Sequence, residues 1–188
     1  EVIQTAIEGV VIIELGFNDA RGYFFESSLQ RDFDRFGPSP YISCKTMKEE
    51  QLRVLRGLHF QKPPYAQSKL VRVIKGAVLD VAVDIRKGST YFRSTCSCRA
   101  DRRKPSSILH PRGFAHGFSV LTPEVIFQYK CDNFYAPQSE GALAWDDPDL
   151  GINWRIPSDK ILLSEKDKRH PRLKDAEWLF DYSEDLYQ

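Results

Sequence analysis

Alternation of apolar and polar residues dominates the middle of this chain. Over residues 78–85 every second residue is a large aliphatic one, which predicts a β-strand, because successive side chains of a strand point to opposite faces of its sheet. The β-branched run 69–74 predicts another strand just before it, with Lys75-Gly76 as a tight turn between the two. The faces of the 78–85 strand are Leu79, Val81, Val83 and Ile85 on one side and Asp80, Ala82 and Asp84 on the other.

The same period of two returns over residues 125–131. It places Val125, Phe127, Tyr129 and Cys131 on one face of a further strand. Glycines and prolines punctuate the intervals between these runs. Several short strands separated by turns predict an antiparallel sandwich or barrel.

Helical pattern is confined to the ends of the chain. Residues 28–36 predict one short amphipathic helix that ends at Gly37-Pro38. The stretch from Ser158 onward carries apolar residues amid charge, and we expect it to pack on the outside of the barrel. We find no internal repeat, linker or low-complexity segment. The sequence therefore predicts a single all-β domain over residues 1–188, with short peripheral helices mainly at the termini.

Composition narrows the class of protein. The 188 residues are 41% hydrophobic and 28% charged with a net charge of +1, which is typical of a soluble globular protein. The charges are scattered, so the sequence shows neither a basic tail that would bind nucleic acid nor a basic stripe that would bind a membrane surface. No apolar stretch approaches the ~20 residues of a membrane helix, and the first residues carry no visible secretory leader. No Cys-x-x-Cys pair is present, so we expect free thiols in a reducing cytoplasm. The cysteines are Cys44, Cys96, Cys98 and Cys131.

Polar residues stand at four places where a strand pattern does not require them. Arg56 and His59 lie among apolar neighbours, Lys69 opens a strand, His116 is flanked by glycine and aromatic residues, and Tyr129 lies on an otherwise apolar face. Each alone has an ordinary explanation, such as a hydrogen-bonded core histidine or a packing tyrosine. Together, a histidine base, a cation and a phenol inside one small barrel form a possible acid–base set.

A metal site is the competing interpretation of the histidines. Barrel metal sites commonly use two histidines from neighbouring positions of one strand, with a carboxylate. Here His59 has no histidine partner in its strand, and His116 is followed by glycine and phenylalanine. His110 is separated from His116 by Pro111 and Gly113, which predict a turn. We therefore expect no metal site.

Ten segments spread nearly from end to end carry a resemblance to a known family. The order and spacing of their unusual residues, as well as the strand pattern, resemble the dTDP-4-dehydrorhamnose 3,5-epimerase family, cofactor-free members of the cupin jelly-roll group. The segments are 17–27, 54–61, 66–73, 80–86, 111–118, 129–131, 135–140, 145–148, 151–154 and 163–167.

The resemblance implies a cupin-like jelly-roll barrel of antiparallel strands and a role for each matching residue. His59 falls on the general base and Asp167 on the carboxylate that orients it. Lys69 falls on the cation facing the keto oxygen of the sugar, and Tyr129 on the acid that returns a proton from the opposite face. The positions that hold the sugar nucleotide are Arg21, Glu26, Arg56, His116, Glu140 and Lys166.

The implied reaction inverts C3 and C5 of dTDP-4-keto-6-deoxy-D-glucose to give dTDP-4-keto-L-rhamnose. A proton beside a ketone can be removed only if the developing enolate oxygen is stabilised, a task suited to Lys69. A neutral histidine is a suitable base near pH 7, and inversion needs a second donor on the other face. The resemblance implies no cofactor, a nucleotide-diphosphate sugar as substrate, and a homodimer in which an N-terminal strand joins the partner's sheet.

Departures from the family pattern leave alternatives open. The run 43–50 lacks a Gln-Asp-Asn-x-Ser-like motif, residues 94–107 diverge, and Phe134 stands where tyrosine is common. The alternatives are an epimerase that inverts C3 only, a 3,4-ketoisomerase, and a non-catalytic sugar-nucleotide-binding barrel. Lys69 and Tyr129 together favour epimerisation, and an intact acid–base set argues against binding alone.

Overall fold

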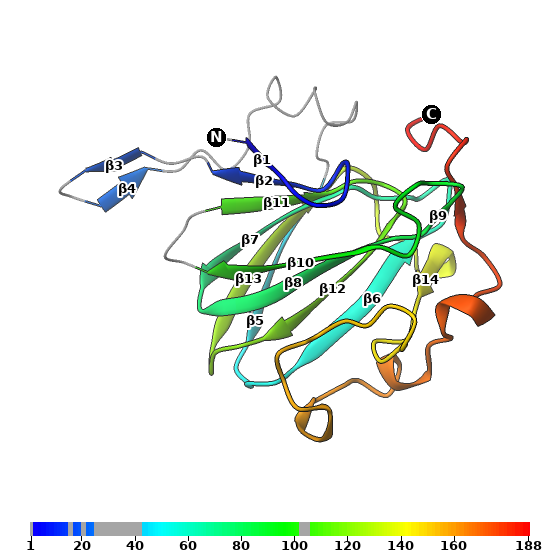
Figure 1. Ribbon diagram of the computed structural model, residues 1–188. Coiled ribbons are helices and arrows are strands. Elements are labelled where there is room, and N and C mark those ends of the chain that lie inside the picture. Colours follow the sequence, from blue (N-terminus) through cyan, green and yellow to red (C-terminus); the bar gives the residue numbers. More distant parts are fainter. Residues whose placement is uncertain (1, 15–16, 20–21, 25–42, 102–105) are drawn as a thin grey trace.

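The computed structural model describes residues 2–14, 17–19, 22–24, 43–101 and 106–188, and these are built almost entirely of β-strands (Figure 1). The strands are β1 (Val2–Gln4), β2 (Val11–Glu14), β3 (Phe17–Asp19), β4 (Gly22–Phe24), β5 (Ser43–Glu49), β6 (Leu55–Gln61), β7 (Lys69–Lys75), β8 (Ala77–Asp84), β9 (Arg86–Lys87), β10 (Thr95–Asp101), β11 (Ser106–His110), β12 (Phe114–Val120), β13 (Val125–Cys131), β14 (Glu140–Ala142) and β15 (Phe180–Asp181).

Helical structure in the described ranges is limited to four single 3₁₀ turns in the last third of the chain. The short helix predicted over 28–36 lies outside the described residues. None of the described helices is long and apolar enough to cross a membrane. The 3₁₀ turns are η1 (Pro137–Ser139), η2 (Ser158–Lys160), η3 (Asp167–Arg169) and η4 (Leu173–Asp175).

Two antiparallel sheets form the barrel. One has the strand order β1-β2-β11-β7-β13-β5 and the other β10-β8-β12-β6-β14. Apolar side chains from both sheets meet between them, among them Val71 and Phe127 from the first sheet and Val78 and Phe118 from the second. The predicted all-β jelly-roll barrel is confirmed.

Gly76 makes the turn predicted between residues 69–74 and 78–85, but the turn does not join hairpin partners. β7 belongs to the six-stranded sheet and β8 to the five-stranded one, so the chain crosses from sheet to sheet at this corner. Gly76 has φ +80°, and a Cβ there would lie 2.1 Å from the carbonyl oxygen of Glu124. Only glycine fits such a left-handed, crowded corner.

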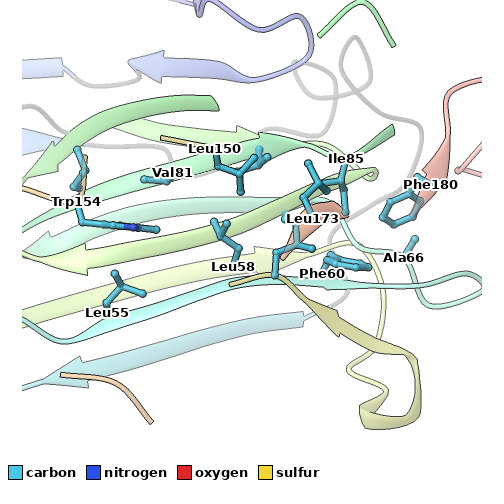
Figure 2. Packing of buried hydrophobic residues seen from close by; sticks show 14 residues of the cluster. Leu55, Leu58, Phe60, Ala66, Val81, Ile85, Leu150, Trp154, Leu173 and Phe180 are labelled. Carbon is cyan, nitrogen blue, oxygen red and sulfur yellow. The ribbon is translucent and has the colours of Figure 1, made fainter. Parts of the chain in front are cut away.

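Both faces of the five-stranded sheet are buried. Every residue of β8 is buried, because its inner face contacts the other sheet and its outer face is covered by the C-terminal part of the chain. In Figure 2 the side chains of Leu150, Trp154, Leu173 and Phe180 lie against this outer face. The expectation that the C-terminal stretch packs on the barrel exterior is confirmed.

Candidate active site

A cavity of about 380 Å³ opens between the two sheets. Three of the four residues expected to be catalytic, His59, Lys69 and Tyr129, line it. The lining comes from both sheets and from the segment that follows β13. It comprises Lys45, Met47, Arg56, His59, Phe60, Gln61, Gln67, Lys69, His116, Phe118, Phe127, Tyr129, Tyr135 and Glu140.

A bulge in β6 places Arg56 and His59 on the same wall of this cavity. In a regular strand residues three apart point to opposite faces. Here Arg56 is paired with Phe118 and His59 with His116, so two residues of β6 stand opposite the single residue Gly117. The extra residue reverses the alternation, which is the geometric effect of a β-bulge. Both polar side chains consequently reach the cavity.

His59 is held by a carboxylate from the far end of the chain. Its Nε2 lies 2.6 Å from Oδ1 of Asp167, which the C-terminal segment carries to β6. Asp167 is buried, and His59 is 29% exposed at the cavity wall. Because Nε2–H donates to the carboxylate, the neutral ring keeps its lone pair on Nδ1. The arrangement can therefore accept a proton at His59.

Asp167 is fixed by more than this one bond. Ser164 Oγ donates to its Oδ2 over 2.8 Å, and Nε2 of His170 lies 3.3 Å from its Oδ1. Burial alone would raise the pKa of Asp167, but the hydrogen bond and charge of His59, together with hydrogen bonds to Ser164 and His170, hold the pKa below its usual value. The carboxylate is thus ionised near neutral pH and can stabilise an imidazolium.

Lys69 and Tyr129 lie on the opposite sheet from His59. Lys69 on β7 stands opposite Cys131, two residues along β13 from Tyr129, so both side chains reach the same wall. Burial lowers the pKa of Lys69, although the charges of Glu140 and Asp80 oppose the shift. Burial also raises the pKa of Tyr129, which keeps its hydroxyl protonated and able to donate.

His116 lines the cavity from the same sheet as His59, its neighbour across the β12–β6 pair. Its Nε2 lies 2.8 Å from Oδ2 of the buried Asp80. Burial lowers the pKa of His116 to about 4, so the ring is neutral near pH 7. With Nε2–H given to Asp80, the ring presents Nδ1 as an acceptor. Such a group suits a hydroxyl of a bound sugar.

Of the residues expected to hold the sugar nucleotide, Arg56, His116 and Glu140 line the cavity, whereas Lys166 does not line it. Lys166 forms an ion pair with Glu140, and Tyr135 donates to the same carboxylate over 3.2 Å. Arg56 is half exposed and lies 3.0 Å from Glu49. Forked guanidinium donors of this kind suit a diphosphate. Arg21 and Glu26 lie outside the described residues.

Comparison with known proteins assigns the family. The family model for dTDP-4-dehydrorhamnose 3,5-epimerase matches residues 4–175. The chain belongs to the dTDP-4-dehydrorhamnose 3,5-epimerase family. The enzyme of that name from Escherichia coli K12 is 42% identical over 171 residues, which are 89% of this chain and 91% of that one. The corresponding enzyme from Methanothermobacter thermautotrophicus is 39% identical over 175 residues, 92% and 94% of the two chains.

Solved structures of the epimerase family superpose on nearly the whole chain. A dTDP-6-deoxy-D-glucose-3,5-epimerase from Legionella pneumophila Philadelphia 1, in complex with dTDP-4-keto-L-rhamnose, has a TM-score of 0.90 at 36% identity and covers 98% of this chain and 99% of its own. A 3'-monoepimerase from Streptomyces bikiniensis, in complex with dTDP-quinovose, has a TM-score of 0.86 at 30% identity, covering 96% and 93%. The expected cupin-like epimerase fold is confirmed.

The epimerase site contains residues that the sequence did not single out. The sequence pattern placed Asp80 only on the polar face of its strand. A carboxylate in the middle of a mainly apolar strand could have indicated a site residue. Lys45 and Met47 come from the 43–50 run that departs from the family pattern, and they line the cavity. Lys45 Nζ lies 4.8 Å from the ring centre of Tyr135. His170 carried no signal, because it lies in a run of charged residues and proline with no strand pattern.

The turn predicted between His110 and His116 is present at residues 112–113, but it does not separate the two rings. His110 ends β11, and the two ring centres are 4.3 Å apart. Two groups within the described ranges have potential metal ligand atoms within 4.8 Å of one another: Asp80, His110 and His116, and His59, Asp167 and His170. In each group the imidazoles converge on the carboxylate itself, an arrangement that also serves to hold it in place.

Proposed function

We propose that this protein epimerises C3 and C5 of dTDP-4-keto-6-deoxy-D-glucose, giving dTDP-4-keto-L-rhamnose. The observation that carries the proposal is a base and an acid on opposite walls of one cavity. His59, paired with Asp167, lies on the five-stranded sheet, whereas Tyr129 and Lys69 lie on the six-stranded sheet. A sugar ring held between the walls meets a base on one face and a phenol on the other.

Each inversion is two proton transfers around an enolate. His59 Nδ1 takes the proton from the carbon beside the ketone, and the electron pair of the C–H bond moves into the enolate. The Lys69 ammonium stabilises the oxygen as this charge develops. The Tyr129 hydroxyl then gives a proton to the other face of the carbon. Exchange with water restores the proton of Tyr129 and removes that of His59, so the net reaction is an isomerisation.

The nucleotide part of the substrate is proposed from the site and from the relatives. The Legionella pneumophila relative was solved with dTDP-4-keto-L-rhamnose. Arg56 carries the forked donors that a diphosphate accepts, and the exposed ring of Tyr135 offers a face for a base. We propose Arg21, Glu26, Arg56, His116, Glu140 and Lys166 as the residues that hold dTDP-sugar.

A C3-only epimerase is the second candidate. It is favoured by the structural similarity to the monoepimerase from Streptomyces bikiniensis. Five curated relatives of 39–42% identity are named 3,5-epimerases, which supports the first proposal. The two reactions use the same base and acid, so only the product distinguishes them.

Proton NMR in heavy water tests the reaction directly. Incubation of dTDP-4-keto-6-deoxy-D-glucose with the protein should replace hydrogen by deuterium at C3 and C5 and give inverted product. Exchange confined to C3 would establish the second candidate, and no exchange would refute both. His59→Asn should lower exchange at C3 by at least about 100-fold while the protein stays folded, because a positioned base is lost. Asp167→Asn should be milder, since that side chain only orients the base.

We also propose that the protein is a homodimer. β1 lies at the edge of its sheet, where Val2 and Ile3 are 43% and 37% exposed. An exposed edge strand with apolar side chains is suited to pairing with another chain. Light scattering that shows only monomer at working concentration would contradict this.

The reaction scheme uses no metal or organic cofactor, and we propose that the protein works in the cytoplasm. All four cysteines are free thiols, which supports a reducing compartment. Full activity after exhaustive chelation is expected. A requirement for stoichiometric metal would overturn the cofactor-free proposal.

A further inference from the structure

A buried carboxylate beside the cavity is contacted by two histidines, and one of them is not part of the proposed machinery. Asp80 is 1% exposed, and its two oxygens have different partners. Oδ2 lies 2.8 Å from His116 Nε2, and Oδ1 lies 2.7 Å from His110 Nε2. Asp80 and His116 belong to the five-stranded sheet, whereas His110 ends β11 in the six-stranded sheet. The His110–Asp80 contact therefore joins the two sheets at the cavity.

His110 is also the cross-strand neighbour of Lys69. The two residues stand directly opposite each other in the β11–β7 pair, where Cβ atoms are about 4.5–5.5 Å apart. Both side chains enter the barrel: Lys69 lines the cavity and His110 contacts Asp80. Burial lowers the pKa of Lys69, and the charge of Asp80 is among the smaller effects that oppose this shift. His110 is thus the strand neighbour of Lys69 and at the same time a direct contact of Asp80.

We propose that His110 is a positioning residue that keeps Lys69 free for the substrate. By occupying Oδ1 of Asp80, it denies Lys69 a direct ion pair with that carboxylate. It also fixes the other oxygen of Asp80 against His116. The ammonium then remains directed at the cavity. The inference rests on the proposed function in one respect: the role of Lys69 in stabilising the keto oxygen of the substrate.

The surroundings of His110 indicate that stability alone does not account for it. The side chain is 2% exposed, and its Nδ1 has no hydrogen-bond partner among the described residues. Its Nε2 contact with Asp80 is close but lies off the direction of an in-line hydrogen bond. A buried polar atom without a hydrogen-bond partner lowers stability, so an aliphatic residue at this position would make the core more stable.

A divalent cation is the alternative occupant of this cluster. The ligand atoms of Asp80, His110 and His116 lie within 4.8 Å of one another. Lys69, however, is close enough for its charge to lower the pKa of His116, and an ammonium at that range would repel a buried cation. Cys98 stands opposite Asp80 on β10, and burial raises its pKa, so its thiol is neutral and supplies no compensating charge. These observations favour a metal-free cluster in which the two histidines contact Asp80 directly.

Two substitutions of His110 separate the positioning role from a packing role. His110→Leu fills the space but leaves Asp80 Oδ1 without its partner, whereas His110→Gln keeps an N–H that can donate to it. We expect His110→Leu to lower kcat for C3 exchange by about 10- to 100-fold with little change in KM, since a displaced catalytic group has an effect of this size. We expect His110→Gln to stay within about 3-fold of wild type. Ile108→Val, a conservative core change on the same strand, should leave kcat unchanged.

A crystal structure of His110→Leu tests the proposal without relying on turnover. Lys69 Nζ should move to within hydrogen-bond distance of Asp80 Oδ1. If the wild type does not act on the dTDP-sugar, the proposed function fails, but this movement of Lys69 still supports the positioning role. An unmoved Lys69, or a kcat for His110→Leu equal to that of Ile108→Val, would overturn it. Stoichiometric zinc or iron in the wild type that His110→Leu loses would overturn it in favour of a metal site.

Discussion

Tyr129 is the residue at which the two halves of the inversion can be separated. Tyr129→Phe keeps the ring and its packing beside Phe127 but removes the hydroxyl that we expect to protonate the enolate. His59 should still abstract the proton, so deuterium should enter C3 with retention while inverted product falls by about 100-fold or more. Proton NMR of the product measures both quantities.

Tyr135 is the internal comparison for this experiment, because it also lines the cavity. Its side chain is 54% exposed, and its hydroxyl donates to Glu140. If Tyr129→Phe inverts the substrate within a few-fold of wild type, Tyr129 merely packs and Tyr135 becomes the candidate acid. Tyr182→Phe, an exposed change outside the cavity, should have no effect on turnover.

At the scale of elements, the bulge in β6 is the feature that assembles the site. It is possible because β6 and β12 approach closely at Gly57 and Gly117. A Cβ on Gly57 would lie 2.5 Å from Gly117 Cα, and the residue has φ +123°. Gly57→Ala should therefore force the strands apart, destabilise the fold by several kcal/mol and displace His59. Urea denaturation and C3 exchange measure the two effects.

Gly151→Ala is the matched control for that change. Gly151 also has a positive φ of 57°, but a Cβ there meets nothing within 4 Å. Only the left-handed backbone is then unfavourable, at a cost of about 1–2 kcal/mol. If Gly57→Ala costs no more than this control and leaves activity intact, the close approach of β6 to β12 does not position the site.

At the scale of the whole molecule, the C-terminal segment both covers the five-stranded sheet and carries the orienting carboxylate. Trp154 is 4% exposed, and its Nε1–H donates to the Trp145 carbonyl over 2.8 Å. Trp154→Ala should lower the free energy of unfolding by about 3–5 kcal/mol, because it opens a cavity under this cover. Urea denaturation measures the loss, and a change below about 1 kcal/mol would show that the cover contributes little. Trp154→Phe should retain most of the stability.

The buried histidine predicts how the stability of the molecule depends on pH. The pKa of His116 is lowered by burial to about 4, against an ordinary value of 6.5. Between these values the unfolded chain binds a proton that the folded protein does not, so stability should rise with pH from about 4 to 6.5. We expect a contribution of about 1–3 kcal/mol over this window. Melting curves of wild type and His116→Gln across it should differ in slope, and equal slopes would contradict the prediction.

The sequence by itself determined the strands and the chemistry that they carry. Alternation identified β8 and β13, because a strand that faces the core on one side has an apolar residue at every second position. It also placed Tyr129 on the same face as Phe127, and both line the cavity. Matching motifs led to the family, and the resemblance implied roles for His59, Lys69 and Asp167, whose residue types suit proton transfer beside a ketone.

Only the tertiary structure decided which strands and side chains meet. The turn at Gly76 looked like a hairpin turn, but local sequence does not specify whether adjoining strands share a sheet. The bulge that turns Arg56 and His59 to one wall breaks the alternation in the sequence, but only the pairing of β6 with β12 shows that both side chains face the cavity. Asp167 reaches His59 across 108 residues, and His110 reaches Asp80 from the other sheet. Such contacts are made between segments far apart in the chain. A periodic pattern predicts that a residue is buried, but it does not predict which other residue packs against it.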